Sequence, residues 1–127
     1  MELVSLVVAL ALVEYFIFAA LVGRARVAHG IEAPATSGHP VFDRTMRVQQ
    51  NTLEQLVIFI PSMYLFGQFV STGLAALLGV VFIVGRVVYY RGYVEDPKKR
   101  SAGFALSTIP VVLLLLGGLL GAAVAAL

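Results

Sequence analysis

Cysteine is absent from this chain of 127 residues, so it can form no disulfide, no thiolate metal site and no cysteine nucleophile. Charge is also scarce. Only 13% of the residues are charged, against about 25% in a typical soluble domain, whereas 60% are hydrophobic. A core of this size cannot hide so much apolar surface from water. The composition therefore excludes a soluble globular protein, a disordered chain and a nucleic-acid-binding protein, and it indicates an integral membrane protein.

Four stretches predict membrane-spanning helices, which need about 20 apolar residues each. They are residues 3–22, about 42–70, 74–90 and 102–127. The second stretch is apolar only over residues 56–70, and polar residues at helical spacing extend it backwards. The sequence Ser71-Thr72-Gly73 predicts a turn that makes the second and third helices antiparallel. We predict an all-α fold, a membrane four-helix bundle of left-handed up-down topology that forms one domain over residues 1–127.

The basic residues predict the orientation of the bundle. All nine lie at the junction of the first and second helices or of the third and fourth: Arg24, Arg26, Arg44, Arg47, Arg86, Arg91, Lys98, Lys99 and Arg100. An up-down bundle places both junctions on one side, and the positive-inside rule makes that side cytoplasmic. We therefore expect residues 23–44 and 91–101 to be cytoplasmic. Compact termini without a signal peptide or other targeting signal favour a bacterial inner membrane over the endoplasmic reticulum.

Two predicted helices carry polar side chains that a membrane should not tolerate. The sets are Arg47, Asn51 and Glu54, at i, i+4 and i+7, and Arg86, Tyr89 and Tyr93, at i, i+3 and i+7. Each set shares one helix face. Arginine and tyrosine at a membrane boundary can be simple anchors, but Asn51 and Glu54 lie one to two turns inside the helix and need partners. They could form an interhelical hydrogen-bond network, or a pocket in which guanidiniums bind the carboxylates of a small anionic ligand and Glu54 accepts from its ammonium.

These residues stand in motifs that resemble the signature of the MAPEG family, the membrane-associated proteins in eicosanoid and glutathione metabolism. The motifs are Arg47-Val48-Gln49-Gln50-Asn51-Thr52-Leu53-Glu54, then Gly85-Arg86-Val87-Val88-Tyr89-Tyr90-Arg91-Gly92-Tyr93, then Lys98-Lys99-Arg100 and Gly103-Phe104. The resemblance covers essentially the whole chain, including the connector from Arg26 to Arg47.

The resemblance implies a homotrimer of four-helix subunits that binds glutathione, as co-substrate, at each subunit interface. No metal is expected. By position in the motifs, the resemblance assigns glutathione binding within one subunit to Arg47, Asn51, Glu54, Tyr89 and Tyr93. It assigns contact with the ligand from the neighbouring subunit to Arg26 and Gln49, and activation of the thiol to Arg100. Two departures are visible, because the family's active synthase has Tyr at the position of Gln55 and a second arginine at the position of Val27.

The chemistry of glutathione explains why an arginine belongs beside its sulfur. The reference thiol pKa is about 8.5, and the nucleophile is the thiolate. Lowering that pKa by about two units takes roughly 2.7 kcal/mol, which one well-aimed guanidinium in a poorly solvated site can supply. We therefore expect Arg100 to stabilise a thiolate that attacks a lipophilic electrophile arriving from the bilayer. The same thiolate could attack the O–O bond of a lipid hydroperoxide.

Two other functions fit parts of the sequence. The family also contains a non-enzymatic member, so a lipid-binding scaffold is one alternative, although a scaffold has little reason to keep a full set of tripeptide-binding residues. The other is a small proton-coupled drug transporter, because such transporters carry one carboxylate in their first span and Glu14 stands in the first predicted helix here. Pairing of Glu14 with a polar group on another helix or subunit is the simpler interpretation, but the sequence does not name the partner.

Overall fold

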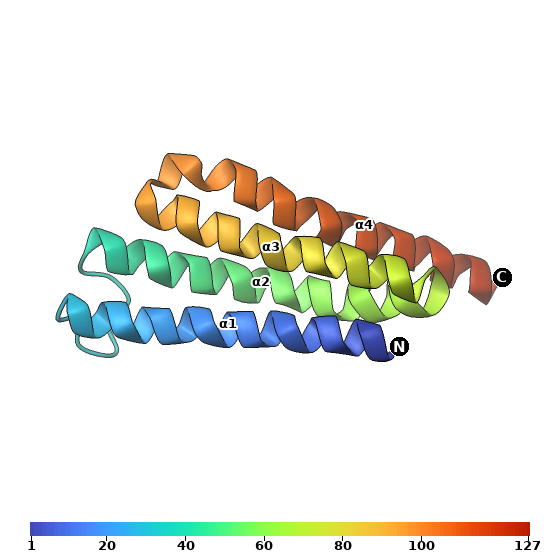
Figure 1. Ribbon diagram of the computed structural model, residues 1–127, viewed down its shortest axis with the longest axis horizontal. Coiled ribbons are helices and arrows are strands. Elements are labelled where there is room, and N and C mark those ends of the chain that lie inside the picture. The colour runs from blue at the N-terminus through green and yellow to red at the C-terminus, as the bar shows by residue number, and fades with distance from the viewer.

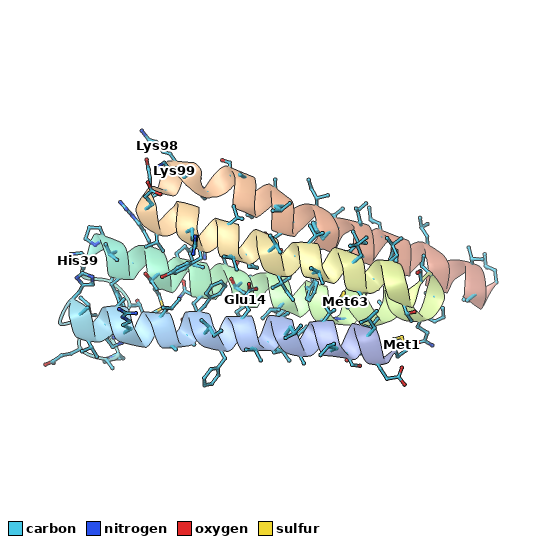
Figure 2. The ribbon with its side chains drawn as sticks, viewed as in Figure 1. Met1, Glu14, His39, Met63, Lys98 and Lys99 are labelled. Carbon is cyan, nitrogen blue, oxygen red and sulfur yellow. The ribbon has the colours of Figure 1, made fainter.

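The computed structural model describes residues 1–127 as four long α-helices with no strand, which confirms the all-α fold (Figure 1). The helices are α1 (Glu2–Ala28), α2 (Pro40–Phe69), α3 (Thr72–Glu95) and α4 (Ser101–Ala126), and a short 3-10 helix, η1 (Pro97–Arg100), precedes α4. Consecutive helices run in opposite directions. The two basic connections therefore lie at one end of the bundle, from which Lys98 and Lys99 project (Figure 2), and both termini lie at the other end.

The interior is filled mainly with apolar side chains. The larger cluster of buried side chains includes Val4, Ala11, Phe59, Phe82 and Leu114, so all four helices contribute to it. A smaller cluster toward the loop end consists of Phe18, Val48 and Tyr89. Most of the outward-facing side chains are apolar too, such as Phe16 with 76% of its surface exposed. An apolar exterior on this scale suits contact with lipid rather than with water.

Three helical segments are long and apolar enough to cross a membrane: Glu2–Ala28, Thr72–Glu95 and Pro97–Ala126. The helix α2 spans 30 residues but does not reach that standard, because polar and charged side chains crowd its first half. That α2 also crosses the membrane stays a prediction. The helices α1 and α3 extend beyond the predicted apolar stretches, since backbone hydrogen bonding continues where hydropathy falls.

The connection between α2 and α3 and the connection between α3 and α4 are both shorter than predicted. The expected turn at residues 71–73 is wrong in its last two residues, because α3 already begins at Thr72. Ser71 is the N-cap of α3, and its Oγ accepts a hydrogen bond of 3.1 Å from the Leu74 backbone N–H. Likewise, most of the expected loop at residues 91–101 is helical, and only Asp96 lies between α3 and η1.

Two glycines bring the backbones of α3 and α4 into direct contact. A Cβ atom added at Gly85 of α3 would lie 2.7 Å from the backbone nitrogen of Ser107 in α4. A Cβ added at Gly103 of α4 would overlap with the backbone of Tyr89 in α3. Small residues allow such close approach between membrane helices. The contact places Arg86 and Tyr89 of α3 directly against the first turns of α4.

Candidate functional site

A cavity of about 540 Å³ lies at the loop end of the bundle, between α2, α3 and the segment around the start of α4. Its lining residues are Arg47, Asn51, Tyr89, Tyr93, Arg100 and Phe104. Each element contributes two side chains at i and i+4, which share one helix face. Five of the six are residues that the sequence analysis proposed for glutathione or its thiol. The structure therefore brings together side chains from three separate parts of the chain.

Aromatic rings form one wall of this cavity. The rings of Tyr89 and Tyr93 lie 5.5 Å apart between centroids, and the ring of Phe104 lies 6.4 Å from that of Tyr89. Phe104 was part of the MAPEG-like motif but was not proposed as a site residue. Its spacing of four residues from Arg100 is the signal that could have found it, because both then face the same side of the chain as α4 begins.

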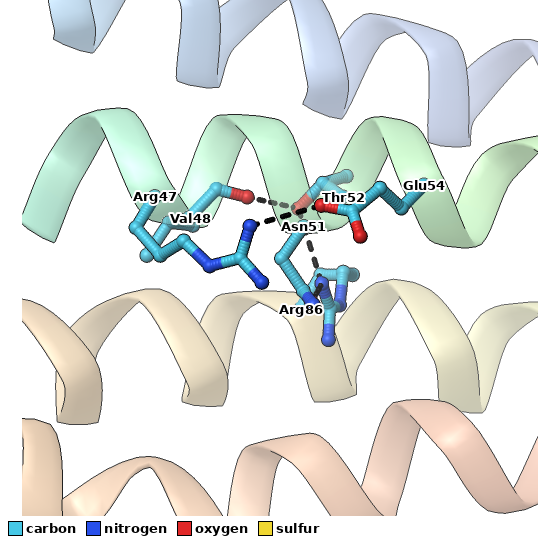
Figure 3. Close-up of polar contacts among 6 residues, drawn as sticks. All are labelled: Arg47, Val48, Asn51, Thr52, Glu54 and Arg86. Atoms are coloured by element: carbon cyan, nitrogen blue, oxygen red, sulfur yellow. Dashed lines mark hydrogen bonds and ion pairs between the residues drawn. The ribbon is translucent and has the colours of Figure 1, made fainter. Parts of the chain in front are cut away.

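Glu54 lies beside the cavity rather than in its lining. Its Oε1 accepts a hydrogen bond of 2.9 Å from Nη1 of Arg47 (Figure 3). The Arg47 and Glu54 side chains are 47% and 61% exposed, and an exposed ion pair is worth only about 0–1 kcal/mol. A ligand that carries both a carboxylate and an ammonium can therefore displace this pair and bind both partners.

A smaller groove of about 290 Å³ adjoins the cavity and shares Asn51 and Phe104 with it. It runs between α2 and α4, and most of the other side chains along it are apolar, including Ile58 and Leu115. Across it, the Gln55 amide donates a hydrogen bond of 3.0 Å to the Thr108 hydroxyl. A polar cavity thus continues directly into an apolar groove.

Glu54 lines the adjoining groove, and the other two proposed site residues line neither the cavity nor the groove in the single chain. Arg26 organises the connection between α1 and α2, where its Nη1 donates 2.8 Å to the Ala35 carbonyl and its guanidinium lies 5.0 Å above the Phe42 ring. Gln49, only two positions from Arg47 on α2, lies on a different helix face and borders neither the cavity nor the groove. Both were expected to act on a neighbouring subunit's ligand, and this remains a prediction.

Arg86 was grouped with Tyr89 and Tyr93 from the sequence but was not included among the site residues. It is fully buried. Its Nη1 donates 2.7 Å to Asn51 Oδ1 and 3.2 Å to Thr52 Oγ1 (Figure 3), and its Nη2 donates 2.7 Å to Ser107 Oγ. Its guanidinium lies 4.3 Å from the centre of the Tyr89 ring. Arg86 thus connects α2, α3 and α4 immediately behind two of the cavity's lining residues.

The end of α3, just before the segment that carries Arg100, is held in place by α2. Arg44 donates hydrogen bonds of 3.2 Å to the carbonyl groups of Val94 and Glu95, at the end of α3. The Arg100 side chain itself is exposed, and its one hydrogen bond, of 3.1 Å, goes to the nearby Pro97 carbonyl. Arg100 therefore combines an anchored backbone with a side chain that is free to reach a ligand.

Comparison with known proteins agrees with the motifs. The model of the MAPEG family matches residues 4–120. The chain is 43% identical over 106 residues to microsomal glutathione S-transferase 2 of Homo sapiens, an alignment that covers 84% of this chain and 72% of the relative. It is 36% identical over 104 residues to leukotriene C4 synthase of Cavia porcellus, covering 82% and 69%. It is also 43% identical over 116 residues to an uncharacterized Synechocystis protein, covering 91% and 85%.

These matches extend over nearly the whole helical bundle, and the three apolar helical segments show a membrane protein. The resemblance that the motifs suggested is thereby confirmed. This chain belongs to the MAPEG family.

Proposed function

We propose that this protein is a membrane glutathione transferase, which conjugates glutathione through its thiolate to lipophilic electrophiles. The observation that carries the proposal is the meeting of five glutathione-type residues in one cavity. The similarity to microsomal glutathione S-transferase 2 and leukotriene C4 synthase supports it.

The charges in and beside the cavity match those of glutathione. The tripeptide carries two carboxylates and one ammonium, and the cavity is lined by two guanidiniums, those of Arg47 and Arg100. Guanidinium groups bind carboxylates through paired, charge-assisted hydrogen bonds. Glu54 at the rim supplies the carboxylate for the ammonium once the ligand displaces Arg47. The hydroxyl groups of Tyr89 and Tyr93 provide further hydrogen-bond donors.

Arg100 is the residue that we expect to stabilise the thiolate. Its guanidinium stays protonated throughout the physiological range, so it favours the charged sulfur without acting as a base. In conjugation the sulfur electron pair forms a bond to the electrophilic carbon, and the leaving group departs with the electrons of the bond that breaks. Attack on a lipid hydroperoxide instead breaks the O–O bond, and a second glutathione then completes reduction to an alcohol, water and glutathione disulfide.

The adjoining groove suits a lipophilic second substrate. It is mostly apolar, and it meets the polar cavity at Asn51 and Phe104. Hydrophobic molecules concentrate in the bilayer, and a molecule lying along this groove would present one end to the cavity. The groove therefore supports an electrophile that enters from the membrane rather than from water.

The proposed working form is a homotrimer in which Arg26 and Gln49 of one subunit reach the glutathione bound by its neighbour. Both lie outside the chain's own cavity, which supports a role at a neighbouring subunit's site rather than at their own. We further propose that the basic loop end, residues 23–44 and 91–101, faces the cytoplasm of a bacterial cell, with the protein in the inner membrane. Cytoplasmic glutathione could then enter the cavity directly.

The test is an ultraviolet titration of the glutathione thiolate with purified protein in detergent. Wild type should show bound thiolate at neutral pH, and Arg100→Ala should raise the bound thiol's pKa by about two units. Lys98→Ala is the matched control, because it removes an exposed cation of the same loop that does not line the cavity. It should titrate like wild type.

The alternatives give different results. Glutathione binding without thiolate or conjugation would favour the lipid-binding scaffold. Absence of glutathione binding would contradict the proposal and return attention to a transporter that uses Glu14. An unchanged titration in Arg100→Ala would remove Arg100 from the mechanism while leaving the transferase function in place.

A further inference from the structure

We infer that Arg86 is a positioning residue, which fixes the direction of the Asn51 carboxamide and thereby makes that part of the cavity a hydrogen-bond donor. The inference rests on the proposed function, because the group it serves is an acceptor of bound glutathione, a carboxylate or a peptide carbonyl.

The direction of the Asn51 carboxamide follows from the chemistry of its partner. A guanidinium only donates hydrogen bonds, so the Asn51 atom that lies 2.7 Å from Arg86 Nη1 must be the oxygen. The amide nitrogen then points to the other side. It makes no hydrogen bond within the chain, it is not buried, and Asn51 lines the cavity. Two N–H donors are therefore available to a ligand there.

Arg86 is itself held so that it cannot turn away. The Thr52 hydroxyl donates 2.8 Å to the Val48 carbonyl, and the Ser107 hydroxyl donates 2.9 Å to the Gly103 carbonyl. Because each hydroxyl proton is used on its own helix, the oxygen lone pairs face the guanidinium and accept from it, at 3.2 Å and 2.7 Å. The orientation of Asn51 thus depends on contacts from α2, α3 and α4.

Glu14 lies in the same interior but makes no contact that would compete for Arg86. It points from α1 into the bundle (Figure 2), is 8% exposed, and neither of its oxygens makes a hydrogen bond. The terminal nitrogens of Arg86 therefore bind only Asn51, Thr52 and Ser107.

A double-mutant cycle tests this role. Glutathione affinity would be measured by calorimetry on purified protein in detergent for Arg86→Lys, Asn51→Ala and the double variant. Lysine keeps the buried positive charge but cannot hold Asn51 and Ser107 together. We expect each single variant to bind at least tenfold more weakly than wild type, and the double variant to bind no more weakly than Asn51→Ala alone.

The control is Thr45→Ala. It removes another buried hydroxyl of α2, one that donates 2.8 Å to the Val41 carbonyl but neither hydrogen-bonds to Arg86 nor lines the cavity. Its affinity should stay within twofold of wild type. If instead the losses in the Arg86→Lys and Asn51→Ala variants multiply in the double variant, Arg86 does not act through Asn51 and the inference is overturned.

Asn51→Asp provides a second test, which does not depend on whether Arg86→Lys folds. Aspartate keeps an acceptor toward Arg86 but replaces the donor that faces the cavity with a second acceptor. We expect a folded protein whose glutathione affinity falls at least tenfold, and wild-type affinity would overturn the inferred direction of the amide. If wild type itself binds no glutathione, the proposed function fails and this inference with it. If wild type binds glutathione but the losses of affinity in the two single variants multiply in the double variant, only the inference is overturned and the proposed function stands.

Discussion

Arg47 and Arg86 both lie beside Asn51, yet the protein holds them in opposite ways (Figure 3). Arg47 pairs with one carboxylate at the rim of the cavity, where both side chains are about half exposed. Arg86 is fully buried and donates to three oxygens on two neighbouring helices. The same side chain therefore serves as an exchangeable binding group in one place and as an internal support in the other.

Solvent exposure explains the difference. Near water an ion pair gains little and separates easily, so Arg47 and Glu54 can release each other when a zwitterionic ligand arrives. In the interior a separated charge would be left without solvation, so Arg86 is committed to its partners. Substitution of Arg86 should therefore damage the fold, and substitution of Arg47 should damage binding.

The largest effect is expected for Arg86→Ala. It removes three hydrogen bonds from a charged donor, each worth about 1.5–3 kcal/mol, and should therefore lower the free energy of unfolding by about 3–5 kcal/mol. Denaturant unfolding in detergent micelles would measure the change. A loss below about 1 kcal/mol would show that Arg86 is not the support described here.

Arg47→Gln should do the opposite of Arg86→Ala: it should weaken glutathione binding and leave the stability of the fold nearly unchanged. Unfolding should change by no more than about 1 kcal/mol, because the pair with Glu54 is exposed. Loss of a charge-assisted hydrogen bond to the ligand, worth about 1.5–3 kcal/mol, should weaken glutathione binding by roughly 10- to 100-fold in calorimetry. Arg91→Gln is the control, since Arg91 is an exposed arginine of α3 outside the cavity. Equal losses of affinity in both variants would point to general charge rather than to Arg47.

Gly103→Ala tests the close packing of α3 against α4 around Arg86 without changing any charged residue. The added methyl group would overlap with the Tyr89 backbone and force α3 and α4 apart, at a cost of about 1–3 kcal/mol in the free energy of unfolding. Gly23→Ala is the matched control, because nothing lies within 4 Å of the added atom there. It should stabilise the protein slightly, by about 0.5–1 kcal/mol, since alanine favours a helix interior. Similar unfolding curves for the two variants would contradict the close contact of α3 and α4.

The smallest effect is expected from salt. Raising ionic strength from about 0.1 M to 1 M shortens the screening length from about 10 Å to 3 Å. Glutathione affinity should fall several-fold, because the guanidiniums of Arg47 and Arg100 lie at an accessible surface. The destabilisation caused by Arg86→Ala should stay the same at both salt concentrations. A salt-sensitive loss in that variant would mean that water reaches Arg86.

Much of the fold could be predicted because hydropathy and helix length are local properties. The four helices lie where the apolar stretches indicated, but their ends differ. Ser71 caps α3, which begins at Thr72 rather than at residue 74 and continues past residue 90 to Glu95. Helix ends depend on single caps and on polar turns that hydropathy does not register. Boundaries were therefore less predictable than the helices themselves.

Part of the site could also be predicted, since spacing shows which side chains share a helix face. It does not show which faces meet. Arg86 was grouped correctly with Tyr89, but its partners Asn51 and Ser107 come from two other helices and are 35 and 21 residues away in the chain. Contacts between helices are determined by packing, which here depends on Gly85 and Gly103.

The restrained connection between α3 and α4 has a consequence for substrate range. A Cβ atom added at Gly92, in the last turn of α3, would lie 2.5 Å from the Lys99 carbonyl oxygen, so the chain folds back tightly upon itself. Arg44 holds the same segment from α2. The entropy of ordering this backbone is lost during folding rather than in each catalytic cycle. The flexible Arg100 side chain can then follow a sulfur atom whose position shifts with the size of the electrophile. We therefore expect a restrained backbone with a mobile Arg100 side chain to make the enzyme tolerant of differently shaped electrophiles.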